Sequence, residues 1–126
     1  MSNLLLVMTG GAIGAGFRYQ LARVAEQQLG GIFPWGTWIA NLLGGLLMGV
    51  LAGVLVSEGP QGEPLRLFLG IGMLGGFTTF SAFSLEMAQM IERGDIAVAG
   101  AYAVSSVAGS VVMLLVGFWA VRAVTA

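Results

Sequence analysis

One stretch of ten residues interrupts an apolar segment that is long enough to cross a membrane. It reads Gly-Gly-Phe-Thr-Thr-Phe-Ser-Ala-Phe-Ser over residues 75–84 and lies in the middle of residues 65–91. Adjacent glycines and adjacent threonines are poor material for a helix interior. In hydrocarbon, irregular backbone is tolerated only where it is buried in protein or lines a cavity. The sequence therefore predicts a broken membrane helix with a functional site at the break.

The composition is that of an integral membrane protein. Hydrophobic residues make up 57% of the 126 residues and charged residues only 9%, whereas a soluble domain carries about 25% charged residues. A net charge of −1 argues against nucleic acid as a partner. The chain has no histidine and no cysteine, which excludes Ser-His and Cys-His catalysis and metal sites built from thiolates or imidazoles. We expect no enzymatic activity.

Four segments have the roughly 20 largely apolar residues that a spanning helix needs. Residues 1–126 are thus expected to form a single all-α transmembrane domain with spans at about 4–25, 35–56, 65–91 and 96–124, the third broken in the middle. Glycines recur every fourth residue, which lets helix backbones approach closely in lipid. These stripes are Gly10 and Gly14, then Gly45, Gly49 and Gly53, then Gly72 and Gly76. They indicate tight packing inside one subunit, and several in so short a chain favour an oligomer as well.

The positive charges are nearly balanced across the membrane. Arg66 and Arg122 fall at one side, and Arg23 and Arg93, with Arg18 slightly deeper, at the other. An excess of Lys and Arg in cytoplasmic loops normally sets orientation. Such a balanced chain is expected to insert both ways round and form an antiparallel homodimer, as inverted repeats do within larger transporters. A single orientation set by weaker cues is the alternative.

Polar side chains at membrane depth follow two helical faces. Thr37 and Asn41 lie on one face of the second span, and Tyr102, Ser106 and Ser110 lie on one face of the fourth. The hydroxyls and the Asn41 amide can donate hydrogen bonds and none of the group is charged. A neutral, donor-rich lining favours a weakly held anion. The Asn41 amide serving only as a helix–helix hydrogen bond is the competing interpretation.

Phe80 and Phe83 follow the break, beside the hydroxyls of Thr79 and Ser81. The edge of a phenyl ring carries positive potential, so edge-on rings can contact a small anion without trapping it. Simple packing is the alternative for both rings. The first half-helix is expected to end near Gly75 and the second to begin near Thr79. In a two-fold dimer, the freed carbonyls of two chains could hold a hard monovalent cation.

Two charged residues of the spans keep more than one interpretation. Arg18 either snorkels to the interface or attracts anions at a vestibule. Glu86 lies two turns past the break. It is a proton-carrying acid, an arginine partner or a residue at the far mouth of the pathway.

The chain resembles the Fluc (CrcB-type) fluoride channels over its whole length. The resemblance rests on Gly-Gly-Ala-Ile-Gly-Ala at 10–15 with Arg-Tyr at 18–19, Gly-Thr at 36–37 with Asn-Leu-Leu-Gly at 41–44, and Gly-Gly-Phe-Thr-Thr-Phe-Ser at 75–81 with Phe83. It implies a dual-topology homodimer in the bacterial plasma membrane, with two antiparallel pores that export fluoride passively.

The resemblance also implies roles for individual residues. Phe80 and Phe83 would be the pore phenylalanines and Asn41 the pore amide, with Tyr102, Ser106 and Ser110 along the track. The carbonyls of Gly75 and Thr78 from both chains would hold a central, structural sodium ion. Ala82 stands where the family commonly has Thr, and Trp38 is bulkier than expected.

Two other functions remain open from the residues alone. A small proton-coupled multidrug exporter would use Glu86 as its acid, but would leave the Phe-Thr-Ser break without a purpose. A membrane scaffold without transport would leave the polar stripes unexplained.

Overall fold

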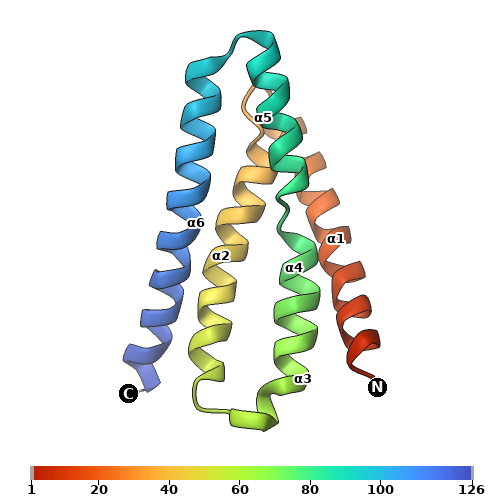
Figure 1. Ribbon diagram of the computed structural model, residues 1–126, viewed down its shortest axis with the longest axis vertical. Coiled ribbons are helices and arrows are strands. Elements are labelled where there is room, and N and C mark those ends of the chain that lie inside the picture. Colours follow the sequence, from red (N-terminus) through yellow and green to blue (C-terminus); the bar gives the residue numbers. More distant parts are fainter. Residues whose placement is uncertain (1, 126) are drawn as a thin grey trace.

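A computed structural model describes residues 2–125, and all regular structure in that range is helical (Figure 1). The predicted domain reaches one residue further at each end, to Met1 and Ala126, which lie outside the described residues. The elements are α1 (Asn3–Gln28), α2 (Trp35–Leu55), the 3₁₀ turn η1 (Gly59–Gly62), α3 (Glu63–Leu65), η2 (Arg66–Leu74), α4 (Gly75–Phe77), α5 (Ser81–Arg93) and α6 (Ile96–Thr125). The N-terminus, the C-terminus and the α2–α3 connection lie at one end of the bundle.

Three helical stretches are long and apolar enough to cross a membrane. They are Trp35–Leu55, Gly59–Arg93 and Ile96–Thr125, so the last three predicted spans are confirmed as candidates. The first predicted span, 4–25, lies within the 26-residue helix α1, which is not among them. Arg18, Gln20 and Arg23 lower the hydropathy of α1, although its length suffices for the purpose.

Local signals in the sequence set the helix ends. The Ser2 hydroxyl accepts a hydrogen bond from the Leu5 N–H at 3.2 Å and so caps α1. Gly94, with φ of +84°, ends α5 and donates its N–H to the Ile91 carbonyl. This left-handed residue is where glycine is favoured after a helix.

The break in the third span lies two residues later than predicted. Gly75 and Gly76 are helical, and the chain leaves the helix at Thr78, which is extended at φ −86° and ψ 159°. The second half begins at Ser81, not near Thr79. The expectation that the first half ends near Gly75 was wrong because packing against α1 outweighs the weak helix propensity of the two glycines.

That packing is very close. A Cβ on Gly76 would lie 2.5 Å from the Gly11 carbonyl oxygen, and one on Gly14 would collide with the Met73 carbonyl. The η2 segment, which precedes the break, is wound in wide π-type turns that are rare in proteins. Glycine thus lets α1 lie directly against η2 and α4.

The other glycine stripe joins α2 to α6. A Cβ on Gly45 would lie 2.7 Å from the Ser110 carbonyl oxygen, and one on Gly53 would lie 3.1 Å from that of Phe118. All three stripes therefore pack helices within one chain, as predicted. They supply no separate argument for an oligomer, because their surfaces are already used.

The second half of the broken helix is held by a compact cluster at the other end of the bundle. Met90 of α5 packs with Ala99 and Tyr102 of α6, all three being buried. Phe33, from the α1–α2 connection, and Phe83 cover this cluster. These contacts keep α5 against α6 beyond the break, where α5 has no glycine contact with α1.

Candidate anion site at the helix break

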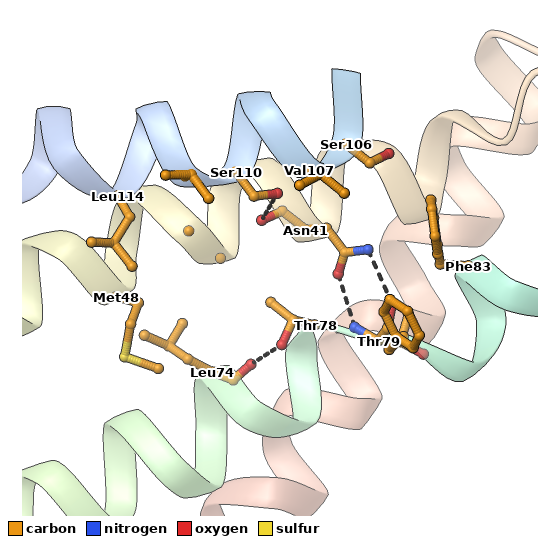
Figure 2. Close-up of a pocket in the computed structure, with 14 residues that line it drawn as sticks. Asn41, Met48, Leu74, Thr78, Thr79, Phe83, Ser106, Val107, Ser110 and Leu114 are labelled. Atoms are coloured by element: carbon orange, nitrogen blue, oxygen red, sulfur yellow. Dashed lines mark hydrogen bonds between the residues drawn. The ribbon is translucent and has the colours of Figure 1, made fainter. Parts of the chain in front are cut away.

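A pocket of about 440 Å³ opens between α2, α6 and the break. Figure 2 shows its wall, with Ser106 and Ser110 of α6 on one side and Thr78 and Thr79 of the break on the other. Its lining comprises Asn41, Gly44, Gly45, Met48, Leu74, Thr78, Thr79, Phe80, Phe83, Ser106, Val107, Ser110, Val111 and Leu114. Every residue in this set is uncharged. The structure therefore brings together Asn41, Thr79, Phe80, Phe83, Ser106 and Ser110 from the predicted site.

Asn41 holds the non-helical backbone of the break. Its Oδ1 accepts a hydrogen bond from the Thr79 N–H at 2.8 Å, and its Nδ2 donates to the Thr79 carbonyl at 3.1 Å (Figure 2). The Asn41 amide thus makes hydrogen bonds to another segment of the chain, as in the competing interpretation that gave it no contact with an anion. An amide nitrogen carries two hydrogens, so the second remains for a pocket occupant.

The threonine hydroxyls are used locally. Thr78 Oγ1 donates to the Leu74 carbonyl at 2.9 Å. Thr79 Oγ1 accepts from the Ala82 N–H at 3.1 Å and lies 3.3 Å from Ser81 Oγ. Such side-chain bonds are typical where a helix ends or restarts. Ser81 itself lies outside the pocket lining.

The two serines of α6 differ in their bonding. Ser110 Oγ donates to the Asn41 carbonyl at 3.3 Å. Ser106 is only 5% exposed, and its Oγ has no hydrogen-bond partner within the described residues. A buried hydroxyl without a partner costs free energy. The Ser106 hydroxyl is thus a group of the lining that a bound ligand would stabilise by accepting a hydrogen bond.

Tyr102 lies apart from this pocket. Its hydroxyl donates to Glu86 Oε1 at 2.8 Å, and the Thr37 hydroxyl donates to Glu86 Oε2 at 2.9 Å. Thr37 and Glu86 line a second cavity of about 330 Å³ beneath the α1–α2 connection. The predicted Tyr-Ser-Ser stripe is thus divided between two surroundings, and Glu86 joins α5 to both α2 and α6.

The two phenylalanines pack against each other, with ring centroids 5.5 Å apart. Phe83 also contacts the Tyr102 ring at 5.0 Å. Phe80 is 75% exposed. A phenyl ring so exposed at the rim of the pocket leaves one side of the site without protein cover.

Arg18 points at the break. Its Nε donates to the Gly76 carbonyl at 3.3 Å, in a partly buried position. A cation at the carboxyl end of a helix is favourable because the carbonyls there are unpaired and partly negative. Arg18 therefore stabilises the end of α4, a role that neither interpretation from the sequence included.

The carbonyls of Gly75 and Thr78 have lost their usual helical donors. The N–H four residues after Gly75 belongs to Thr79 and donates to Asn41 Oδ1. The N–H four residues after Thr78 belongs to Ala82 and donates to Thr79 Oγ1. Both carbonyls therefore lack the N–H partners that a continuous helix would give them.

Sequence reasoning missed one pair. Trp38 Nε1 donates to Ser105 Oγ at 2.9 Å and joins α2 to α6 just beyond the pocket. Ser105 falls on a different face of α6 from the stripe. The one feature of the sequence that could have pointed to this pair was the unusual bulk of Trp38.

The chain is similar to known proteins over nearly its whole length. Residues 5–118 match a family model described as CrcB-like protein, Camphor Resistance (CrcB). A Phenylobacterium zucineum protein is 54% identical over 127 residues that cover all of both chains. Proteins from Novosphingobium aromaticivorans and Chelativorans sp. are 50% and 48% identical, each over 98% of this chain and 99% of the relative. All three are named fluoride-specific ion channel FluC.

Proposed function

The chain belongs to the CrcB-like protein family, and on that premise we propose that it is a fluoride channel that lets fluoride leave the cell passively. It is a multi-pass membrane protein. The relatives named above are bacterial, so the setting is the bacterial plasma membrane. Ion channels are not enzymes, in keeping with the chain's composition.

The unpartnered hydroxyl of Ser106 is the observation that carries this proposal. It is buried in a pocket whose lining has donors but no charged side chain. A fluoride ion accepts hydrogen bonds strongly, so the Ser106 hydroxyl and the free hydrogen of Asn41 replace part of its water shell. Without a fixed positive charge the ion is held weakly enough to leave.

A second copy of the chain completes the site in this proposal. The 75% exposure of Phe80 leaves the pocket open on one side, and a partner would cover it. The balanced arginines favour an antiparallel homodimer with two pores, each lined by both chains. In this assembly α1 also crosses the membrane, so that each chain has four spans. It packs along η2 and α4 through Gly10, Gly14 and Gly76.

A sodium ion at the dimer centre is part of the same proposal. The carbonyls of Gly75 and Thr78 from both copies would hold it, because each lacks its helical donor. The ion would balance the partial negative charge of these carbonyls and join the helix breaks of the two chains. Within each chain, Asn41 and the Thr79 hydroxyl keep these carbonyls free by binding the competing N–H groups.

The proton-coupled multidrug exporter is not supported. The relatives carry the name of a fluoride channel, and both oxygens of Glu86 accept hydrogen bonds from neighbouring hydroxyls. A carboxylate with both oxygens hydrogen-bonded to other helices has a structural role, because it joins α5 to α2 and α6. A scaffold without transport leaves the unpaired Ser106 hydroxyl unexplained.

Passive efflux from liposomes tests the proposal. Purified protein is reconstituted into liposomes loaded with potassium fluoride. A potassium ionophore is added so that no membrane potential builds up to stop the efflux, and fluoride release is followed with an electrode. We expect rapid fluoride efflux without a proton gradient and no comparable chloride efflux. Export that depends on a proton gradient would revive the exporter, and an absence of any flux would contradict the channel.

A further inference from the structure

The hydrogen bond between Trp38 and Ser105 lies outside both cavities, and its role is not explained by a contact with an ion. Trp38 Nε1 donates to Ser105 Oγ at 2.9 Å, and Ser105 Oγ donates in turn to the Tyr102 carbonyl at 3.4 Å. We propose that Trp38 is a positioning residue: through Ser105 it sets the rotation of α6, which aims the Ser106 hydroxyl into the pocket. This inference rests on the proposed function for its transport readout.

The close glycine contacts between α2 and α6 do not extend to the part of α6 that carries Ser105, so this hydrogen bond is needed to join the two helices there. From the pocket toward the chain termini, α2 and α6 are in close contact at Gly45, Gly49 and Gly53 of α2 and at Gly117 of α6. On the other side of the pocket, a Cβ on Gly36 would meet Ala22 of α1 instead, and one on Gly100 of α6 would meet nothing within 4 Å. This part of α6 packs on α5 through Ala99 and Tyr102, but it lacks the glycine contacts with α2 that the rest of the helix has.

The indole ring is itself well held, so its N–H has a defined direction. Trp38 packs edge-on against Phe33 and Trp35, with centroids 6.0 and 5.7 Å away. Phe33 packs edge-on against Tyr102 at 5.4 Å. A donor fixed by aromatic packing loses little conformational freedom when it bonds. The bond to Ser105 therefore restrains α6 more than a bond from a flexible side chain would.

The position of Ser105 determines that of its neighbour. Successive residues in an α-helix are about 100° apart around the axis. With Ser105 bound to α2, Ser106 must point about 100° away, toward the break, and it is the buried hydroxyl there without a partner among the described residues. Rotation of α6 about its axis would turn this hydroxyl, and that of Ser110 on the same face, away from the pocket.

Two variants remove the bond in different ways. Trp38→Phe keeps an aromatic ring but loses the N–H, and Ser105→Ala loses the acceptor. Ser105→Thr keeps a hydroxyl and serves as the conservative rescue. Trp35→Phe is the matched control, because Trp35 belongs to the same aromatic cluster and, unlike that of Trp38, its indole N–H makes no hydrogen bond within residues 2–125.

Two readouts are needed, and the absence of cysteine from the chain allows the second. The first is fluoride efflux from liposomes. The second is the rate at which a small methanethiosulfonate reagent modifies a Ser106→Cys variant, with and without each further substitution. The thiol rate reports the orientation of position 106 and does not depend on conduction.

A neutral hydrogen bond of ordinary net strength corresponds to a factor of about three to ten. We expect Trp38→Phe and Ser105→Ala each to slow both fluoride efflux and thiol modification by about this factor, because position 106 then turns away from the pocket. The double variant should be no worse than either single one, and Ser105→Thr and Trp35→Phe should match the parent. Unchanged thiol rates in both single variants, or equal losses with Trp35→Phe, would overturn the proposal. If the parent itself conducts no fluoride, the proposed function fails while the thiol rates still decide the positioning role.

Discussion

Asn41 of α2 binds both backbone polar groups of Thr79, at 2.8 Å through Oδ1 and at 3.1 Å through Nδ2. One side chain thus supplies both partners that a helix would have given this residue. Irregular backbone in hydrocarbon requires such partners. The break is therefore a stable feature of the fold, and Asn41 connects its stability to the lining of the pocket.

Replacing Asn41 by aspartate should damage both stability and transport. Asn41→Asp removes the donor to the Thr79 carbonyl and places a carboxylate against that oxygen and the entering anion. We expect a loss of about 1–3 kcal/mol in stability and loss of fluoride efflux, measured by thermal unfolding in detergent and by liposome flux. Asn3→Asp, which adds the same charge at an exposed position, should do neither. Normal flux in Asn41→Asp would remove this side chain from the pathway.

Removing the Ser106 hydroxyl should separate stability from function. Because Ser106 Oγ is buried without a partner in the described structure, Ser106→Ala should leave stability unchanged or raise it by about 1 kcal/mol. Fluoride efflux should fall, because the pathway loses a donor. Ser84→Ala, at an exposed position of α5, is the control for both measurements. A Ser106→Ala protein with full flux would exclude this hydroxyl as an anion contact.

The ring edges of Phe80 and Phe83 are expected to contribute to conduction. Phe80→Ile and Phe83→Ile keep apolar bulk and remove the polarised edge, and we expect a loss of the same order as for a pair of aromatic rings, about 0.5–1.5 kcal/mol per ring. Fluoride efflux should therefore fall by up to about tenfold. The proposed dimer should persist in size-exclusion chromatography with light scattering. Phe17→Ile alters an exposed ring of α1 and should conduct as the parent does; equal rates in all three variants would count against edge-on contact.

Close packing of α1 on the segment before the break can be tested with two glycines two residues apart. A Cβ on Gly14 would collide with the Met73 carbonyl and lie 2.8 Å from the Phe77 nitrogen, whereas one on Gly16 would meet nothing within 4 Å. We expect Gly14→Ala to cost about 2–3 kcal/mol. Gly16→Ala should stabilise the helix by about 0.5–1 kcal/mol. Thermal unfolding compares the two, and equal midpoints would show that α1 does not lie against η2 as described.

The all-helical architecture and most of the helix bounds were predictable because they depend on local signals. Apolar length identified the last three spans. The spacing of glycine placed Gly10 with Gly14, and Gly45 with Gly49, on packed faces, since residues four apart share a helix face. The first span shows the limit of hydropathy, because α1 is a long helix with polar residues toward its carboxyl end.

The sequence by itself determined that this is a helical membrane protein with an interrupted third span and a neutral, hydroxyl-rich interior. These properties follow from composition and from periodicity along one helix. Only the tertiary structure decided where the break falls and which polar groups stay free. Contact with α1 keeps Gly75 and Gly76 helical, while Asn41 holds Thr79 out of the helix. Ser110 finds the Asn41 carbonyl and Tyr102 finds Glu86, but Ser106 finds no partner in the described chain. A hydrogen-bond partner on another helix has no fixed sequence separation, so no pattern along the chain could distinguish these three hydroxyls.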